Sequence, residues 1–81
     1  MPKIVVNVML KEEILDPQGQ AVAAAMTRLG FKFAKQVRQG KRFEILCDHK
    51  PTNGDLASAK EAAQNLLANL VIEDFTISVE D

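Results

Sequence analysis

The order of strand-like and helix-like hydrophobic patterns along the chain constrains its fold more than any other feature. Four stretches have the alternation or β-branched content of strands, and two have the spacing of an amphipathic helix. Strands are expected at residues 3–10, 31–38, 41–48 and 71–79, and helices at residues 16–30 and 56–70. This order is the split β-α-β unit. It predicts one ferredoxin-like α+β domain over residues 1–81, with a four-stranded antiparallel sheet and both helices on one face.

The first expected strand is apolar on both of its sides. Ile4, Val6 and Val8 alternate with Val5 and Met9. A strand of this kind is normally covered on both faces, but the two helices cover only one. We therefore expect self-association through the open sheet face or an exposed strand edge, with about 800 Å² buried per partner.

A glycine inside the first turn of the first helix needs an explanation. Asp16 is a good N-cap and Pro17 suits the first helical position, whereas Gly30 suits the end of the helix. Gly19 costs the helix up to about 1 kcal/mol relative to alanine. Either this glycine is simply tolerated, or it allows another backbone to approach closely, within a dimer or in a larger subunit. The second hypothesis predicts that Gly19→Ala stabilises the isolated chain slightly and weakens assembly.

Basic residues surround a second glycine at the expected hairpin. Gly40 is expected to take a positive φ in the turn between the second and third strands. Arg38, Lys41 and Arg42 flank it. They form either a charged hairpin that protects the edges of the sheet or a docking surface for an acidic partner.

Few residues are suited to catalysis. Cys47 is interpreted as a small buried hydrophobe on the third expected strand. His49 is two residues away, but no third group is evident that would orient a nucleophile–base pair. One Cys and one His are too few ligands for a metal site, and no phosphate-binding glycine motif is present. Two adjacent acidic pairs are interpreted as solvated charges, namely Glu12–Glu13 and Glu73–Asp74. No catalytic, cofactor-binding or metal-binding residue is predicted.

The charge balance and the cysteine count narrow the class of protein further. Ten basic and eleven acidic residues argue against a general nucleic-acid binder. No apolar run approaches the roughly 20 residues of a membrane-spanning helix, and no secretory cleavage site is apparent. A single cysteine fits a reducing compartment. We expect a cytoplasmic protein that binds neither nucleic acid nor membrane.

Three segments together resemble one family. These are "ILDPQGQAV" after the first strand, "VRQGKRFEI" at the hairpin and "LLANLVIEDF" before the last strand. Their order and spacing resemble PurS, the small subunit of phosphoribosylformylglycinamidine (FGAM) synthase, over essentially the whole chain. One departure is Leu70, where the family usually has proline. Because a firm helix stop is lost, the second helix is expected to extend or fray there.

The resemblance implies a non-catalytic adaptor in de novo purine biosynthesis. Such chains form a homodimer or tetramer and bridge a large subunit (PurL) and a glutaminase subunit (PurQ). The complex is a ligase in which ammonia released from glutamine reaches PurL, which binds ATP and Mg²⁺; the adaptor binds no cofactor. The predicted partner-binding residues are Asp16, Gln18, Gly19, Arg38, Gly40, Lys41 and Arg42. A small-ligand regulatory module is the alternative, and RNA binding is a third possibility that the charge balance disfavours.

Overall fold

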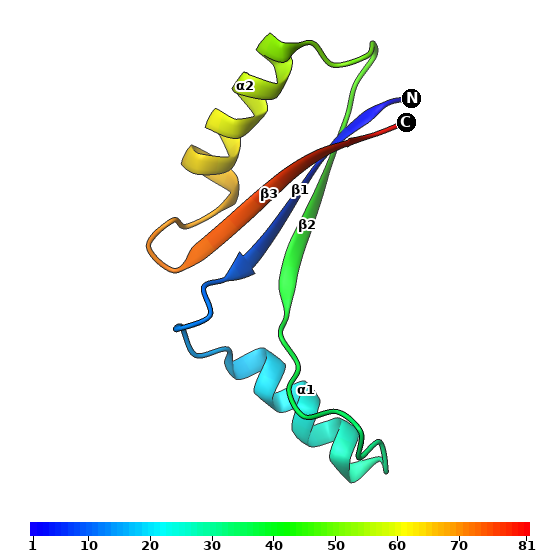
Figure 1. The fold of residues 1–81 in the computed structure, drawn as a ribbon, viewed down its shortest axis with the longest axis vertical. Helices are drawn as coiled ribbons and strands as arrows, with labels where there is room; N and C mark the ends of the chain where they lie inside the picture. The colour runs from blue at the N-terminus through cyan, green and yellow to red at the C-terminus, as the bar shows by residue number, and fades with distance from the viewer.

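Three antiparallel strands form the sheet, and the first of them lies in the middle. The computed structural model describes residues 1–81. Its elements are β1 (Lys3–Leu10), α1 (Pro17–Arg28), β2 (Gly40–Leu46), α2 (Asn53–Ala62), a π-helical turn η1 (Ala63–Leu67) and β3 (Glu73–Glu80). The strand order is β2-β1-β3, and the two termini lie side by side at one end of the sheet (Figure 1). The prediction of an α+β chain with two helices and an antiparallel sheet is confirmed.

The prediction of a fourth strand at residues 31–38 is wrong. This segment does not pair with β2 but returns alongside α1 (Figure 1), where Gln39 donates its backbone N–H to Asp16. Nor is Gly40 a turn residue with positive φ; it begins β2 opposite Met9, and only Gly30 has a positive φ. A Cβ on Gly40 would lie 2.3 Å from the carbonyl oxygen of Val8. Close strand approach therefore explains this glycine.

Helix α1 projects away from the sheet, so the prediction of two helices on one face is also wrong. Only α2 and η1 pack there, while α1 lies beyond the opposite end of the strands (Figure 1). The radius of gyration is 15.9 Å, whereas a compact chain of this length would have about 12 Å. The expected helix signals are confirmed. Asp16 caps the start of α1. At its end, Gly30 has a positive φ; the Gly30 N–H donates to the Thr27 carbonyl oxygen, and the Phe31 N–H donates to that of Met26.

The core lies between β1 and α2 and is small. Only seven of the 81 residues are buried. Val6, Val8 and Ala63 form its centre. Partly buried hydrophobic side chains surround them, including Phe43, Ile45, Leu67, Phe75 and Ile77. No helix is long and apolar enough to cross a membrane.

The open face of the sheet carries many charged side chains, although β1 is apolar on both sides. Val5 on this face is fully buried beneath a charged network that spans all three strands. Lys3 lies 3.0 Å from Glu44, and Arg42 lies 3.0 Å from Glu44 and 3.1 Å from Glu80. This network covers Val5 and leaves Met9 and Leu46 as exposed apolar side chains of this face, at 38% and 64%; self-association through it stays a prediction. Five of the twelve exposed large apolar side chains lie on or beside α1, namely Leu15, Val22, Leu29, Phe31 and Phe33.

Helix α2 begins earlier than expected because Thr52 and Asp55 form a capping box. The Asp55 N–H donates to Thr52 Oγ1, and the Thr52 N–H donates to Asp55 Oδ2. At the other end, Ala68 leaves the helix with an extended backbone. Leu70 therefore lies in a turn, and the expected extension of the helix to this residue is wrong.

Candidate partner-binding site

Asp16 ties the start of α1 to the segment that returns to the sheet. Its Oδ1 accepts the Gly19 N–H at 2.9 Å, and its Oδ2 accepts the Gln39 N–H at 2.8 Å. Bonds from Gln39 first, and then from Gly19, hold the pKa of Asp16 below its ordinary value. One carboxylate thus caps a helix and closes residues 11–39 into a single unit, which we call the arm.

Gly19 is buried at the place where the two sides of the arm touch. A Cβ there would lie 2.2 Å from the Val37 carbonyl oxygen and 2.6 Å from Asp16 Oδ2. Another backbone does approach this glycine closely, but it belongs to the same chain. The expectation that Gly19→Ala stabilises the isolated chain is therefore reversed. Beside this contact, Gln39 Nε2 donates to Gln18 Oε1.

The arm is fixed to the end of the sheet from both of its ends. The Arg38 guanidinium donates to the carbonyl oxygen of Leu10, the last residue of β1. The Lys11 N–H donates to the carbonyl oxygen of Ile72 at 2.8 Å, just before β3. These bonds set the direction in which the arm leaves the sheet.

Lys41 and Glu73 face each other across the same end of the sheet. Lys41 Nζ lies 3.3 Å from Glu73 Oε2, and Glu73 Oε1 accepts the Asn69 N–H at 2.7 Å. The Asn69 bond first, and Lys41 less strongly, lower the pKa of Glu73. The interpretation of Glu73 as a solvated charge is wrong, because its carboxylate closes the turn before β3.

The structure brings most of the predicted partner-binding residues together. Asp16, Gln18, Gly40 and Lys41 line a shallow hollow of about 410 Å³ at this junction. Gly19 is buried and donates its N–H to Asp16 but does not line the hollow, and Arg38 lines the adjacent hollow with the acidic side chains of Glu12 and Glu13. Arg42 is the exception, because it lies in the network on the open face of the sheet.

Two residues of this junction were missed by sequence reasoning. Gln39 bonds both Asp16 and Gln18, and Glu73 bonds Asn69 and Lys41. Gln39 acts only through residues distant along the chain, and Glu73 does so through Lys41, although its bond from Asn69 is local. The capping box could have been found, because Thr52 and Asp55 have the spacing of that motif.

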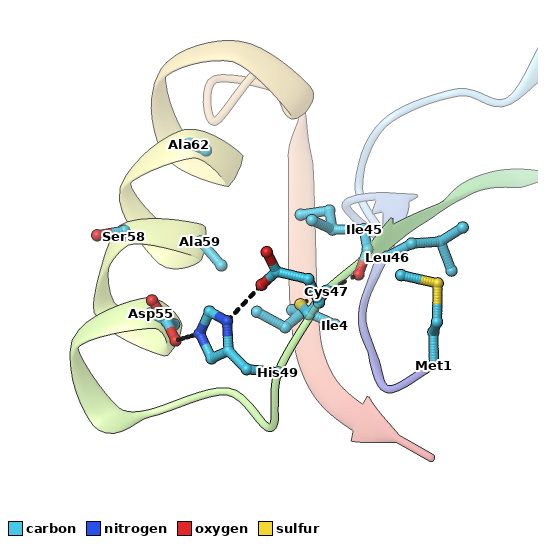
Figure 2. Close-up of a pocket in the computed structure, with 11 residues that line it drawn as sticks. Met1, Ile4, Ile45, Leu46, Cys47, His49, Asp55, Ser58, Ala59 and Ala62 are labelled. Carbon is cyan, nitrogen blue, oxygen red and sulfur yellow. Dashed lines mark hydrogen bonds and ion pairs between the residues drawn. The ribbon is translucent and has the colours of Figure 1, made fainter.

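A second hollow of about 550 Å³ lies between α2 and the end of β2 (Figure 2). His49 stands at its rim between Asp48 and Asp55, with Nε2 at 2.8 Å from Asp55 Oδ2. Bonding to Asp55 first, and then to Asp48, raises the pKa of His49. The thiol of Cys47 contacts the Ile45 carbonyl oxygen at 3.6 Å. Cys47 and His49 therefore form no nucleophile–base pair, and no three His, Cys, Asp or Glu side chains are grouped to hold a metal ion.

These features define the class to which the chain belongs. A small α+β chain with a minimal core and an apolar arm held away from its sheet is an assembly module. Its most organised polar cluster serves to fix the direction of that arm.

Comparison with known proteins gives the family. Residues 3–81 match the family model described as PurS: Phosphoribosylformylglycinamidine (FGAM) synthase. The chain is 54% identical to phosphoribosylformylglycinamidine synthase subunit PurS of Mycobacterium leprae, over 99% of this chain and 98% of that relative. The crystal structure of Bacillus subtilis PurS covers 100% of both chains at 41% identity with a TM-score of 0.83. The chain belongs to the PurS family, whose members are subunits of FGAM synthase.

Two further solved structures have the same fold. Methanocaldococcus jannaschii PurS, described as one of the subunits of formylglycinamide ribonucleotide amidotransferase in the purine biosynthetic pathway, is 33% identical with a TM-score of 0.84, over 100% of this chain and 98% of that one. A chain in the structure of PurLQS from Thermotoga maritima has a TM-score of 0.86 at 20% identity, over 98% and 96% of the two chains. The three-stranded sheet and projecting arm therefore belong to the family fold.

Proposed function

We propose that this chain is the non-catalytic adaptor of FGAM synthase and that it bridges PurQ and PurL so that ammonia passes between them. The observation that carries the proposal is the arm. Its exposed apolar residues include Leu29 and Phe33, at 74% and 77% exposure. Such a surface on a small chain is suited to assembly.

The accessible surface of the chain supports self-association as a homodimer or tetramer. The area is 5901 Å², whereas a compact monomer of 8.9 kDa would expose about 4,800 Å². The excess of about 1,100 Å² is comparable to the surface that one protein loses in a stable complex, about 800 Å². A copy whose arm is covered would regain the burial of an ordinary domain.

The family comparison supports the choice of larger partners. Methanocaldococcus jannaschii PurS is one subunit of an amidotransferase of the purine pathway, and the Thermotoga maritima structure is of PurLQS. The complex of this chain would then contain PurL and PurQ. ATP and Mg²⁺ would be bound by PurL, which forms the amidine, while this chain supplies position only.

Two of the predicted basic residues are well placed to face a partner. The side chain of Lys41 is 51% exposed and that of Arg42 is 44% exposed. The Arg38 guanidinium instead donates a hydrogen bond to the Leu10 carbonyl oxygen of the same chain. Together with Asp16, Gln18 and Gly19, it would act by fixing the arm rather than by touching the partner, whereas Gly40 allows β2 to approach β1 closely.

Co-sedimentation of the three proteins tests the bridging role. PurL and PurQ from the same source would be centrifuged with and without this chain. An adaptor is expected to bring PurQ into the PurL fraction only when the chain is present. Equal recovery of PurQ in both samples would refute the bridge.

A small-ligand regulatory module is the second candidate, because the hollow beside α2 is of ligand size. A thermal-shift screen of the isolated chain with amino acids and nucleotides separates the two functions. Ligand binding to the native state raises the melting temperature, whereas a pure adaptor gives no shift.

A further inference from the structure

Asn53 is the one asparagine of the chain that is followed by a glycine. The other three asparagines are followed by Val8, Leu66 and Leu70. The side-chain amide carbon of an asparagine is open to attack by the backbone nitrogen of the next residue, and a side chain on that next residue hinders the attack. Glycine has no Cβ and the widest choice of backbone angles. The pair Asn53–Gly54 is therefore the place where this chemistry is least hindered.

Both reacting groups of this pair are accessible in the structure. Asn53 and Gly54 are exposed and form the first two residues of α2, which follows the loop from β2 (Figure 1). The Gly54 N–H donates no hydrogen bond within the chain, as is usual for an amide in the first turn of a helix. The Asn53 side chain makes no hydrogen bond either. A Cβ on Gly54 would meet only Thr52 Oγ1, at 3.7 Å.

The closed first turn of α2 keeps these two groups from reacting. Attack requires rotation about the Cα–C bond of Asn53, away from the helical angle. Three bonds around Thr52 oppose this rotation: the Asp55 N–H donates to its Oγ1 at 3.1 Å, its own N–H donates to Asp55 Oδ2 at 2.9 Å, and the Leu56 N–H donates to its carbonyl oxygen at 3.0 Å. The ends of helices open at a small cost in free energy. The capping box therefore controls how often Asn53 leaves the helix.

We propose that Asn53 is a site of deamidation whose rate is set by the capping box of α2. The Gly54 nitrogen forms a bond to Asn53 Cγ, and the bond between Cγ and Nδ2 breaks. Nδ2 leaves as ammonia with the proton of the Gly54 amide, so that a cyclic succinimide remains. Water then opens the ring. Addition at Cγ gives aspartate, and addition at the main-chain carbonyl carbon gives isoaspartate, in which the chain continues through Cγ.

The two products have opposite effects on the start of α2. Aspartate adds a negative charge in the first turn, which the helix dipole favours, and it leaves the backbone unchanged. Isoaspartate adds the Cβ of residue 53 to the main chain. Thr52 and Asp55 then no longer have the spacing that the capping box needs. Because Asp55 Oδ2 also lies 2.8 Å from His49 Nε2, the link between the loop and the helix is weakened as well.

Peptide mapping of the aged chain tests the site. The full-length chain would be incubated for several weeks at pH 8, digested and analysed by mass spectrometry, with synthetic peptides that carry asparagine, aspartate or isoaspartate at position 53 as standards. Asn65 is the control within the same molecule, because it is exposed in the helical segment that continues α2 but is followed by Leu66. Asn53 should convert at least about tenfold faster than Asn65.

Two variants separate the attack from its control by the fold. Gly54→Ala adds a methyl group that fits the structure, and it should slow conversion at least about tenfold because the attacking nitrogen becomes hindered. Thr52→Ala removes the cap and should speed conversion at least about threefold. Wild type unfolded in urea gives the rate without any helix, which should be faster than the rate in the folded chain.

Three results would overturn the inference. Equal conversion of Asn53 and Asn65 in wild type refutes the site and needs no variant. An unchanged rate in Gly54→Ala refutes attack by the Gly54 nitrogen. Equal rates in the folded and urea-unfolded chain, or in wild type and a folded Thr52→Ala variant, refute control by the capping box. The circular dichroism spectrum of each variant reports whether it is folded.

Discussion

Replacing Gly19 by alanine should destabilise the chain, although the substitution improves the helix propensity of α1. The added Cβ would lie 2.2 Å from the Val37 carbonyl oxygen, which is backbone, and 2.6 Å from Asp16 Oδ2. One side of the arm must then move by about 1 Å to restore van der Waals contact. This movement pulls Asp16 away from the Gln39 N–H that it holds at 2.8 Å.

The magnitude follows from two opposing terms. Overpacking at a site that relaxes only partly costs about 1–3 kcal/mol. Alanine returns up to about 1 kcal/mol of helix propensity, and less in a first turn. The free energy of unfolding should therefore fall by about 1–2 kcal/mol, which lowers the melting temperature of a chain of this size by several degrees.

Urea unfolding at one fixed protomer concentration measures this change, since stability of an associating protein depends on concentration. Gly54→Ala is the matched control, because Gly54 lies in the first turn of α2 and its added Cβ would meet only Thr52 Oγ1 at 3.7 Å. The control should be unchanged or slightly more stable. If Gly19→Ala is as stable as Gly54→Ala, the close contact with Val37 does not govern this position.

Three further predictions concern charged groups. Asp16→Asn should keep the cap on Gly19 but lose the bond from Gln39, so amide exchange in the arm should be faster than in wild type and slower than in Asp16→Ala; equal rates in both variants would contradict the double role. Hydrogen bonding to Asp55 and then Asp48 raises the pKa of His49 above 6.5. Protonated His49 therefore stabilises the fold below pH 6.5, and this contribution is lost as pH rises through the raised pKa. The melting temperature should fall across this window in wild type and not in His49→Gln. Lys41→Glu, which faces Glu73, should raise the chain concentration needed for half-maximal glutamine-dependent activity, whereas the exposed control Lys60→Glu should not.

Local signals in the sequence predicted the elements well. Asp16, Pro17 and Gly30 mark the bounds of α1 because capping chemistry is local. Predictions that rest on residues close together in the sequence are therefore confirmed.

Features that depend on distant contacts could not be predicted in the same way. Residues 31–38 have strand-like composition, but the bonds of Asp16 and Arg38 direct this segment along α1. The apolar Val5 suggested an open interface, yet Lys3, Arg42 and Glu44 cover it with a charged network. Helix α1 has the pattern of a packed helix, but the sequence of one chain does not say whether its apolar face packs within that chain or against another copy.

Activity of the reconstituted enzyme tests the adaptor role most directly. PurL and PurQ would be assayed for amidine formation with glutamine and, separately, with ammonium chloride, while this chain is titrated. The account predicts that glutamine-driven activity depends strongly on the chain and that ammonia-driven activity depends on it much less. Equal glutamine-driven activity with and without the chain would contradict the account.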